Sequence, residues 1–247
     1  ISDVATTIDY VSIASTGNAI DFGDLTQARA VFESAGSPTR GINAGGSNPD
    51  TNTIDFVTIA TTANATDFGN ASSANASVGA LASPTRAVFG GGADNRIEYI
   101  TIASEGDAID YGNLTAATHE PCSTSSSTRG MWAGGYAPSP SPSRTNIIQY
   151  VEIATLGNAL DFGDLTVIQT SLAATSSPTR AIFSGGYSAP HQYDMVTIAS
   201  KGNAVRFGDM ASIRARHDGC SNGTRGVFGG GRSGGGFQIE GRLEYIT

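Results

Sequence analysis

The sequence predicts an all-β repeat fold in which one short antiparallel sheet recurs along the chain. Five imperfect copies of one unit align, and in each an arginine follows an aromatic residue by 18 positions and a Gly-Gly pair ends 6 positions after that arginine. Successive aromatics lie 46, 43, 51 and 45 residues apart, so the length changes fall after the Gly-Gly pair. A fixed unit of this size indicates neighbours that stack to bury their apolar faces.

The copies cover the repeat domain almost without interruption. An isoleucine precedes each aromatic by 9 positions. The aromatics are Phe22, Phe68, Tyr111, Phe162 and Phe207, and the isoleucines are Ile13, Ile59, Ile102, Ile153 and Ile198. We expect a single domain over residues 1–247, with units at about 8–46, 54–92, 97–135, 148–186 and 193–231, and with 232–247 starting a further unit or closing the fold.

Each copy contains four predicted strands, named c, d, a and b in chain order. Strand c alternates apolar and polar residues, as in 8–14, and a Gly-Asn pair then favours a tight hairpin into strand d. Strand a, predicted over 26–36, ends at Ser37-Pro38-Thr39, where proline presets a turn. Strand b ends at the paired glycines, which are typical of a bulge or of closely approaching backbones.

Four short antiparallel strands per unit, about five units and no helical periodicity indicate a β-propeller. The spacing Arg-x4-Gly-Gly before an alternating strand and a short aromatic strand resembles the kelch repeat, although Phe or Tyr replaces the usual Trp. The stretch from Ile13 to Leu25, followed by Ser37 to Arg40, also resembles repeat-rich structural proteins of marine tailed bacteriophages, cyanophages especially. This second resemblance implies a tail or appendage protein.

The number of predicted strands indicates how many blades the ring contains and how it closes. Five four-stranded blades form if the last a–b pair, about 213–231, joins the first c–d pair, 8–25, in one mixed blade, which would also hide the sheet edges. Residues 243–247 repeat the start of strand c and leave a larger ring as the alternative.

Charge and hydropathy exclude two kinds of partner. The net charge is −8 and Lys201 is the only lysine, whereas binding to nucleic acid or to an anionic membrane requires a basic surface. No apolar run approaches the roughly 20 residues that cross a bilayer. We expect no nucleic acid partner and no membrane insertion.

The antiparallel order places the b–c and d–a links on one face of the disc and the a–b and c–d links on the other. The first, called the loop face below, carries the length variation, and varied loops on a rigid scaffold favour recognition, with unconstrained drift as the alternative. Its candidate binding residues are Asn48, Asp50, Asp94, Asn95, Arg96, Tyr136, Arg144, Tyr187, His191, Gln192, Arg232 and Phe237.

The five arginines follow the a–b turns on the opposite face. We expect each to be structural, either pairing with an aspartate of strand d such as Asp21 or capping a carbonyl, and a guanidinium ring that clamps an anion is the alternative. They are Arg40, Arg86, Arg129, Arg180 and Arg225.

Other motifs favour packing over chemistry. Asp-Phe-Gly at 21–23 lacks the remaining kinase elements, and Asp24 and its equivalents favour turn capping over calcium. The H-x-x-C spacing at 119–122 and 217–220 directs its two residues to opposite faces of a strand, which disfavours zinc. We expect no cofactor and no bound metal.

These observations favour a non-enzymatic structural or binding module of a phage virion, extracellular or virion-bound. Its partners would be other virion subunits or a host-surface glycan or receptor, and it could form a homo-oligomer. The alternative is a free lectin-like glycan-binding propeller. A propeller enzyme such as a copper oxidase or a sialidase is disfavoured, because neither the metal ligands nor the characteristic repeats occur.

Overall fold

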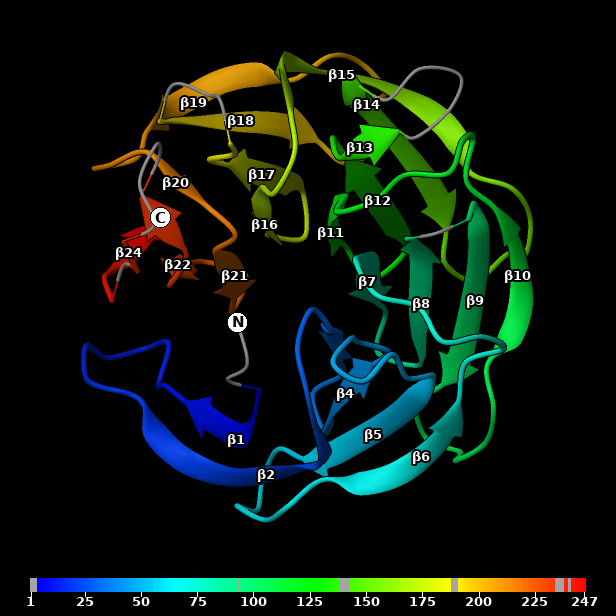
Figure 1. Cartoon of the computed structure of the whole chain (residues 1–247). Helices are drawn as coiled ribbons and strands as arrows, with labels where there is room; N and C mark the ends of the chain where they lie inside the picture. The colour runs from blue at the N-terminus through cyan, green and yellow to red at the C-terminus, as the bar shows by residue number, and fades with distance from the viewer. Residues whose placement is uncertain (1–3, 93, 138–142, 188–190, 234–237, 240) are drawn as a thin grey trace.

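The protein is a β-propeller of five antiparallel blades (Figure 1). The computed structural model describes residues 4–92, 94–137, 143–187, 191–233, 238–239 and 241–247. All regular structure within these residues is β, and they contain no helix long and apolar enough to cross a membrane. The predicted fold class is confirmed.

Each four-stranded blade joins the a and b strands of one copy to the c and d strands of the next. Blade 1 contains β3 (Glu33–Gly36), β4 (Arg40–Ala44), β5 (Thr53–Thr58) and β6 (Thr66–Asn70); blade 2 contains β7 (Val78–Ala82), β8 (Arg86–Gly91), β9 (Arg96–Thr101) and β10 (Ile109–Asn113). Blade 3 contains β11 (Cys122–Ser125), β12 (Arg129–Ala133), β14 (Ser143–Glu152) and β15 (Leu160–Gln169), with β13 (Tyr136–Ala137) beside β14. Blade 4 contains β16 (Ala173–Ser176), β17 (Arg180–Ser184), β18 (Gln192–Thr197) and β19 (Val205–Asp209).

Blade 5 has three strands, β21 (Asp218–Ser221), β22 (Gly226–Gly229) and β24 (Leu243–Ile246). The first c–d pair forms a separate N-terminal hairpin of β1 (Ala5–Tyr10) and β2 (Ile20–Arg29), which lies in the ring between blade 5 and blade 1 (Figure 1). The short strands β20 (Arg214–Ala215) and β23 (Arg232–Ser233) pair with each other.

The prediction that the last a–b pair and the first c–d pair form one mixed closing blade is wrong. Strand β22 pairs with β24, whereas β1 pairs with β2. β24 has the alternation of a c strand and follows β22 closely in sequence, so the pairing closes a far shorter loop than pairing with β1 would. The hairpin still meets blade 5, because Arg225 donates a hydrogen bond of 3.4 Å to the carbonyl of Ile13.

Several strand boundaries also differ from the prediction. Strand d of the first copy continues to Arg29, so strand a occupies only Glu33–Gly36 rather than 26–36. Strand c ends before each repeated isoleucine, and the c–d link of blade 2 spans residues 102–108 instead of a tight hairpin. The link is long because it reaches across to the neighbouring blade.

The c–d link of the next blade contacts the Asp-Phe-Gly segment of strand d. A Cβ on Gly163 would lie 2.5 Å from the carbonyl oxygen of Gly202 in the next link. Gly202 donates its N–H to the carbonyl of Phe162 at 2.9 Å, and Asn203 Oδ1 accepts the N–H of Asp164 at 3.1 Å. Glycine is required here because the two backbones touch.

The core lies largely between neighbouring blades. Ile198 of blade 4 packs in one buried cluster with Phe162 and Tyr150 of blade 3, whose rings meet edge to face with centroids 5.8 Å apart. Trp132 is fully buried, and its Nε1 donates to the carbonyl of Gly79 in blade 2 at 3.0 Å. The apolar faces of single blades are thus buried by stacking.

Four of the five repeat arginines cap a carbonyl in the next unit. Arg86 donates to the carbonyl of Ile153 at 3.0 Å and its guanidinium lies 4.6 Å from the ring centroid of Tyr99 in its own blade. Arg40, Arg129 and Arg225 cap Ile102, Ile198 and Ile13 and lie over Phe56, Tyr150 and Tyr245 in the same way. Of the two structural roles expected, the structure shows carbonyl capping, and Arg180 is the exception.

Candidate functional site

The two kinds of link on the loop face lie side by side. Ala30 of a d–a link exchanges two backbone hydrogen bonds with Ser47 of a b–c link, at 2.8 and 2.7 Å. His119 and Tyr136 form the same bridge in blade 3. The a–b turns instead contact the c–d links through the arginine caps, so the predicted division into two faces agrees with these contacts.

The paired glycines give the loop face a rigid base. A Cβ on Gly45 would lie 2.3 Å from the carbonyl oxygen of Asn75, and one on Gly185 equally close to that of Arg214. Gly46 and Gly186 donate their N–H groups to these same two carbonyls at 2.9 Å. These two Gly-Gly pairs therefore lie against the d–a link that enters the next blade, which explains why glycine is needed there.

The d–a links turn at one repeated left-handed residue that the sequence did not reveal. It lies 9 positions before each repeat arginine, and its φ is between 50° and 60° in all five copies, at Val31, Ser77, Glu120, Ser171 and Arg216. In three of them its N–H donates to the same position of the previous link, for example from Glu120 to the carbonyl of Ser77 at 3.0 Å. The five residues are of four different types, one apolar, one polar and two of opposite charge, so the backbone geometry identifies this position and the side chain does not.

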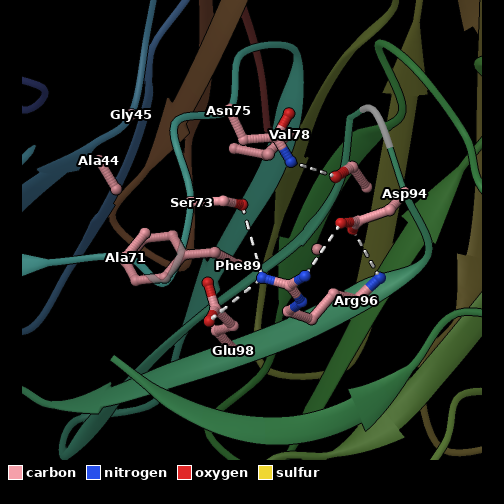
Figure 2. Close-up of a pocket in the computed structure, with 12 residues that line it drawn as sticks. Ala44, Gly45, Ala71, Ser73, Asn75, Val78, Phe89, Asp94, Arg96 and Glu98 are labelled. Carbon is pink, nitrogen blue, oxygen red and sulfur yellow. Dashed lines mark hydrogen bonds and ion pairs between the residues drawn. The ribbon is translucent and has the colours of Figure 1, made fainter. Parts of the chain in front are cut away.

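A small hollow opens on the loop face between blades 1 and 2 (Figure 2). The guanidinium of Arg96 points into it and is held by the carboxylates of Asp94 at 3.4 Å and Glu98 at 4.0 Å, and by the hydroxyls of Ser72 and Ser73. The predicted residues Asp94 and Arg96 thus lie together. The hollow has about 30 Å³ open to water, room for roughly two water molecules.

An exposed aromatic pair lies on the same face over blades 3 and 4. Tyr136 and Tyr187 directly follow the Gly-Gly pairs of these blades and are 39% and 49% exposed. Arg144 stands opposite Tyr136 in the pairing of β13 with β14, and its guanidinium lies 5.8 Å from the ring centroid of Tyr187. Three predicted residues from two blades therefore form one surface cluster, the Tyr136–Arg144–Tyr187 cluster.

The other predicted residues are scattered over the face. Asn48, Asp50 and His191 are exposed, and Arg232 lies half-buried in β23. Asn95 and Gln192 are bonded within the fold, the first to the carbonyl of Leu114 at 3.4 Å and the second to Asp194 at 2.9 Å. Phe237 lies outside the described residues.

Two groups near the inner strands, the half-buried Glu33 and the buried His217, have strongly shifted pKa values. Burial, with a smaller contribution from the charge of Asp218, raises the pKa of Glu33 to about 8. Burial and nearby Arg214 lower the pKa of His217 to about 4, and its Nε2 lies 2.8 Å from the hydroxyl oxygen of Ser184. His217 is therefore a neutral packing residue at pH 7, as expected for the H-x-x-C segment. Among the described residues, no group of three or more His, Cys, Asp or Glu side chains is placed to hold a metal ion.

Comparison with known proteins supports the fold and goes no further. No family model and no curated protein matches the sequence. A solved structure described as "Structure of YjhT" is similar, with a TM-score of 0.75 and 11% sequence identity over 93% of this chain and 85% of that chain. At this identity the likeness is one of fold alone.

Proposed function

We propose that this chain is a non-enzymatic recognition module that uses its loop face to bind a host-surface glycan. The observation that carries the proposal is the Tyr136–Arg144–Tyr187 cluster, in which two exposed tyrosines occupy the same repeat position in adjacent blades beside an arginine. Such tyrosines offer an amphipathic ring to a sugar, and the arginine offers several N–H donors to hydroxyl or carboxylate oxygens.

The setting proposed for this binding is the virion of a tailed bacteriophage, in a tail or appendage, where a kelch-like disc would contact other subunits through its remaining surface. The support is the likeness of the repeat, from Ile13 to Leu25 and from Ser37 to Arg40, to repeat-rich phage structural proteins. The net charge of −8 agrees with a partner that is neither nucleic acid nor an anionic bilayer.

The glycan proposal is tested by changing both tyrosines to alanine and measuring binding of the labelled protein to host cells and to an array of purified host glycans. We expect at least tenfold weaker binding with unchanged thermal unfolding. The matched control is Leu156→Ala, because Leu156 is an exposed apolar residue in a c–d link on the opposite face. Equal binding by the double variant and the control would overturn the assignment of this cluster.

A free glycan-binding propeller is the second candidate, and the same tyrosine pair favours it. The two settings are separated by immunogold labelling and by mass spectrometry of purified phage particles. A fixed number of copies per particle supports a virion component. Glycan binding by a protein absent from the particles supports the free lectin.

A further inference from the structure

The interface between blades 4 and 5 is open on the face opposite the loop face. A pocket of about 270 Å³ lies there, lined by Arg180, Ile182 and Phe207 of the blade 4 side and by Arg225 and Ile246 of blade 5, among others. In the interfaces of blades 1 with 2, 2 with 3, and 3 with 4, a buried isoleucine of the c–d link fills the equivalent place, at Ile102, Ile153 and Ile198.

The outer strand of blade 4, β19, is more exposed than the equivalent strands and lacks their contacts with a neighbouring c–d link. Phe207 is 39% exposed, whereas the aromatics at the same position, Phe22, Phe68, Tyr111 and Phe162, are between 2% and 8% exposed. A Cβ on the glycine that follows each of these four would lie 2.4 or 2.5 Å from a backbone atom of the next c–d link, but one on Gly208 would meet no described atom within 4 Å. β19 thus keeps the aromatic and glycine residues on which a c–d link packs in the other blades, but no described c–d link packs on them.

Arg180 completes the pattern. The other four repeat arginines donate to an isoleucine carbonyl and lie over an aromatic ring. Among the described residues, the Arg180 side chain donates no hydrogen bond to an isoleucine carbonyl, and its backbone N–H donates to Ser177 Oγ. Met195 stands in the strand position where Tyr99 or Tyr150 lies in other blades. Its guanidinium borders the pocket with its donors available.

We propose that this open face is a binding site for a peptide segment that carries the repeat's own c–d link and d strand, Ile-Ala-x-x-Gly-Asn-Ala-x-Asp-Phe-Gly. By equivalence with the interface of blades 3 and 4, the isoleucine side chain enters the pocket and its carbonyl accepts from Arg180. The glycine N–H donates to the carbonyl of Phe207, and the asparagine Oδ1 accepts the N–H of Asp209, as Gly202 and Asn203 do for Phe162 and Asp164.

The rest of the segment has a strand edge to join. In blades 1 to 4 strand d pairs with the outer edge of strand c, and in blade 5 strand c is β24, which pairs with β22 on its inner side. A d strand added to β24 would form main-chain hydrogen bonds while the isoleucine supplies register, which is the mode of recognition known as β-augmentation. The partner is therefore recognised by backbone pairing and by one apolar anchor.

The probe is a fluorescent peptide with the sequence of residues 153–165, IATLGNALDFGDL, whose binding to the whole chain is followed by anisotropy. We expect saturable binding that is weakened at least tenfold when the first isoleucine of the peptide is replaced by aspartate. Absence of binding at about 1 mM peptide, the weak end of specific affinity, would overturn the proposal.

Two variants of the protein decide whether the site is the one described. Gly208→Ala has space in the free protein and should leave thermal unfolding unchanged, yet its Cβ would meet the peptide backbone as one on Gly163 would meet Gly202. Arg180→Met removes the carbonyl cap. Both should weaken binding at least tenfold, and Gly241→Ala, also in open space, should not. Equal affinity of all three proteins would show that the peptide binds elsewhere.

Discussion

The arginine caps make a prediction that compares two copies of the same residue in one chain. Arg86→Met should destabilise the protein, whereas Arg180→Met should be nearly neutral. Arg86 bonds the carbonyl of Ile153 at 3.0 Å and lies 4.6 Å from the centroid of Tyr99, and the side chain of Arg180 makes neither contact with the described residues. Methionine retains an unbranched apolar side chain and removes both contacts.

The magnitude follows from the two lost contacts. A hydrogen bond from a charged donor is worth about 1.5 to 3 kcal/mol, and a partly exposed cation–π contact about 0.5 to 1 kcal/mol. Arg86 is half-buried, so we expect a loss of about 2 to 3 kcal/mol. For a chain of this size that lowers the unfolding midpoint by about 5 to 10 °C.

The assay is equilibrium urea unfolding of the parent and both variants, followed by circular dichroism and by the fluorescence of Trp132, the only tryptophan. Arg180→Met should lie within about 0.5 kcal/mol of the parent, the usual range for a surface substitution. Losses of equal size in the two variants would refute the capping argument, because they would show that the arginine acts within its own turn.

Three further changes test packing and titration. Gly163→Ala should cost about 3 kcal/mol or prevent folding, since its Cβ would overlap the backbone of the next link, and thermal unfolding measures this. The folded pKa of Glu33 is raised from 4.5 to about 8, so its contribution to the free energy of unfolding is fully present below pH 4.5 and is lost as the pH rises through 8. Glu33→Gln, which does not titrate, should therefore become more stable than the parent by about 2 kcal/mol between pH 5 and pH 9. The folded pKa of His217 is lowered from 6.5 to about 4, so its contribution to the free energy of unfolding is present above pH 6.5 and is lost as the pH falls through 4. Denaturant titrations should show that the free energy of unfolding falls by up to about 3 kcal/mol over this pH range in the parent, and that His217→Asn removes this pH dependence.

Much of the scaffold could be predicted from fixed spacings. The constant distance from the aromatic to the arginine and from the arginine to the Gly-Gly pair fixed the order of strands d, a and b, and the structure has them in that order. The glycines were expected where backbones approach closely, and Gly45 and Gly185 lie against the carbonyls of Asn75 and Arg214. These predictions succeeded because each depended on sterics within reach of a few residues.

Other features depend on contacts that local patterns do not encode. The partner of β22 was mispredicted because β1 and β24 carry similar alternating patterns, and only the shorter closure distinguishes them. The left-handed position at Val31, Glu120 and Arg216 was missed because the backbone imposes it on dissimilar side chains. The meeting of Arg144 with Tyr187 depends on how two adjacent blades are set, which the spacing within one copy does not determine.

The structure gives the repeated residues a common role, which also explains why variation lies on the other face. Arg86 reaches the next blade, Gly163 touches the next link, and Asp164 donates its N–H to the next asparagine. A change at any of these positions must be matched by a change in the neighbouring copy, so the face built from them is constrained pairwise around the ring. The b–c links begin after the last such contact at the Gly-Gly pair, and they can change in length and side chain without disturbing a blade interface. Loops that differ from one blade to the next are therefore accommodated on the loop face, where the Tyr136–Arg144–Tyr187 cluster lies.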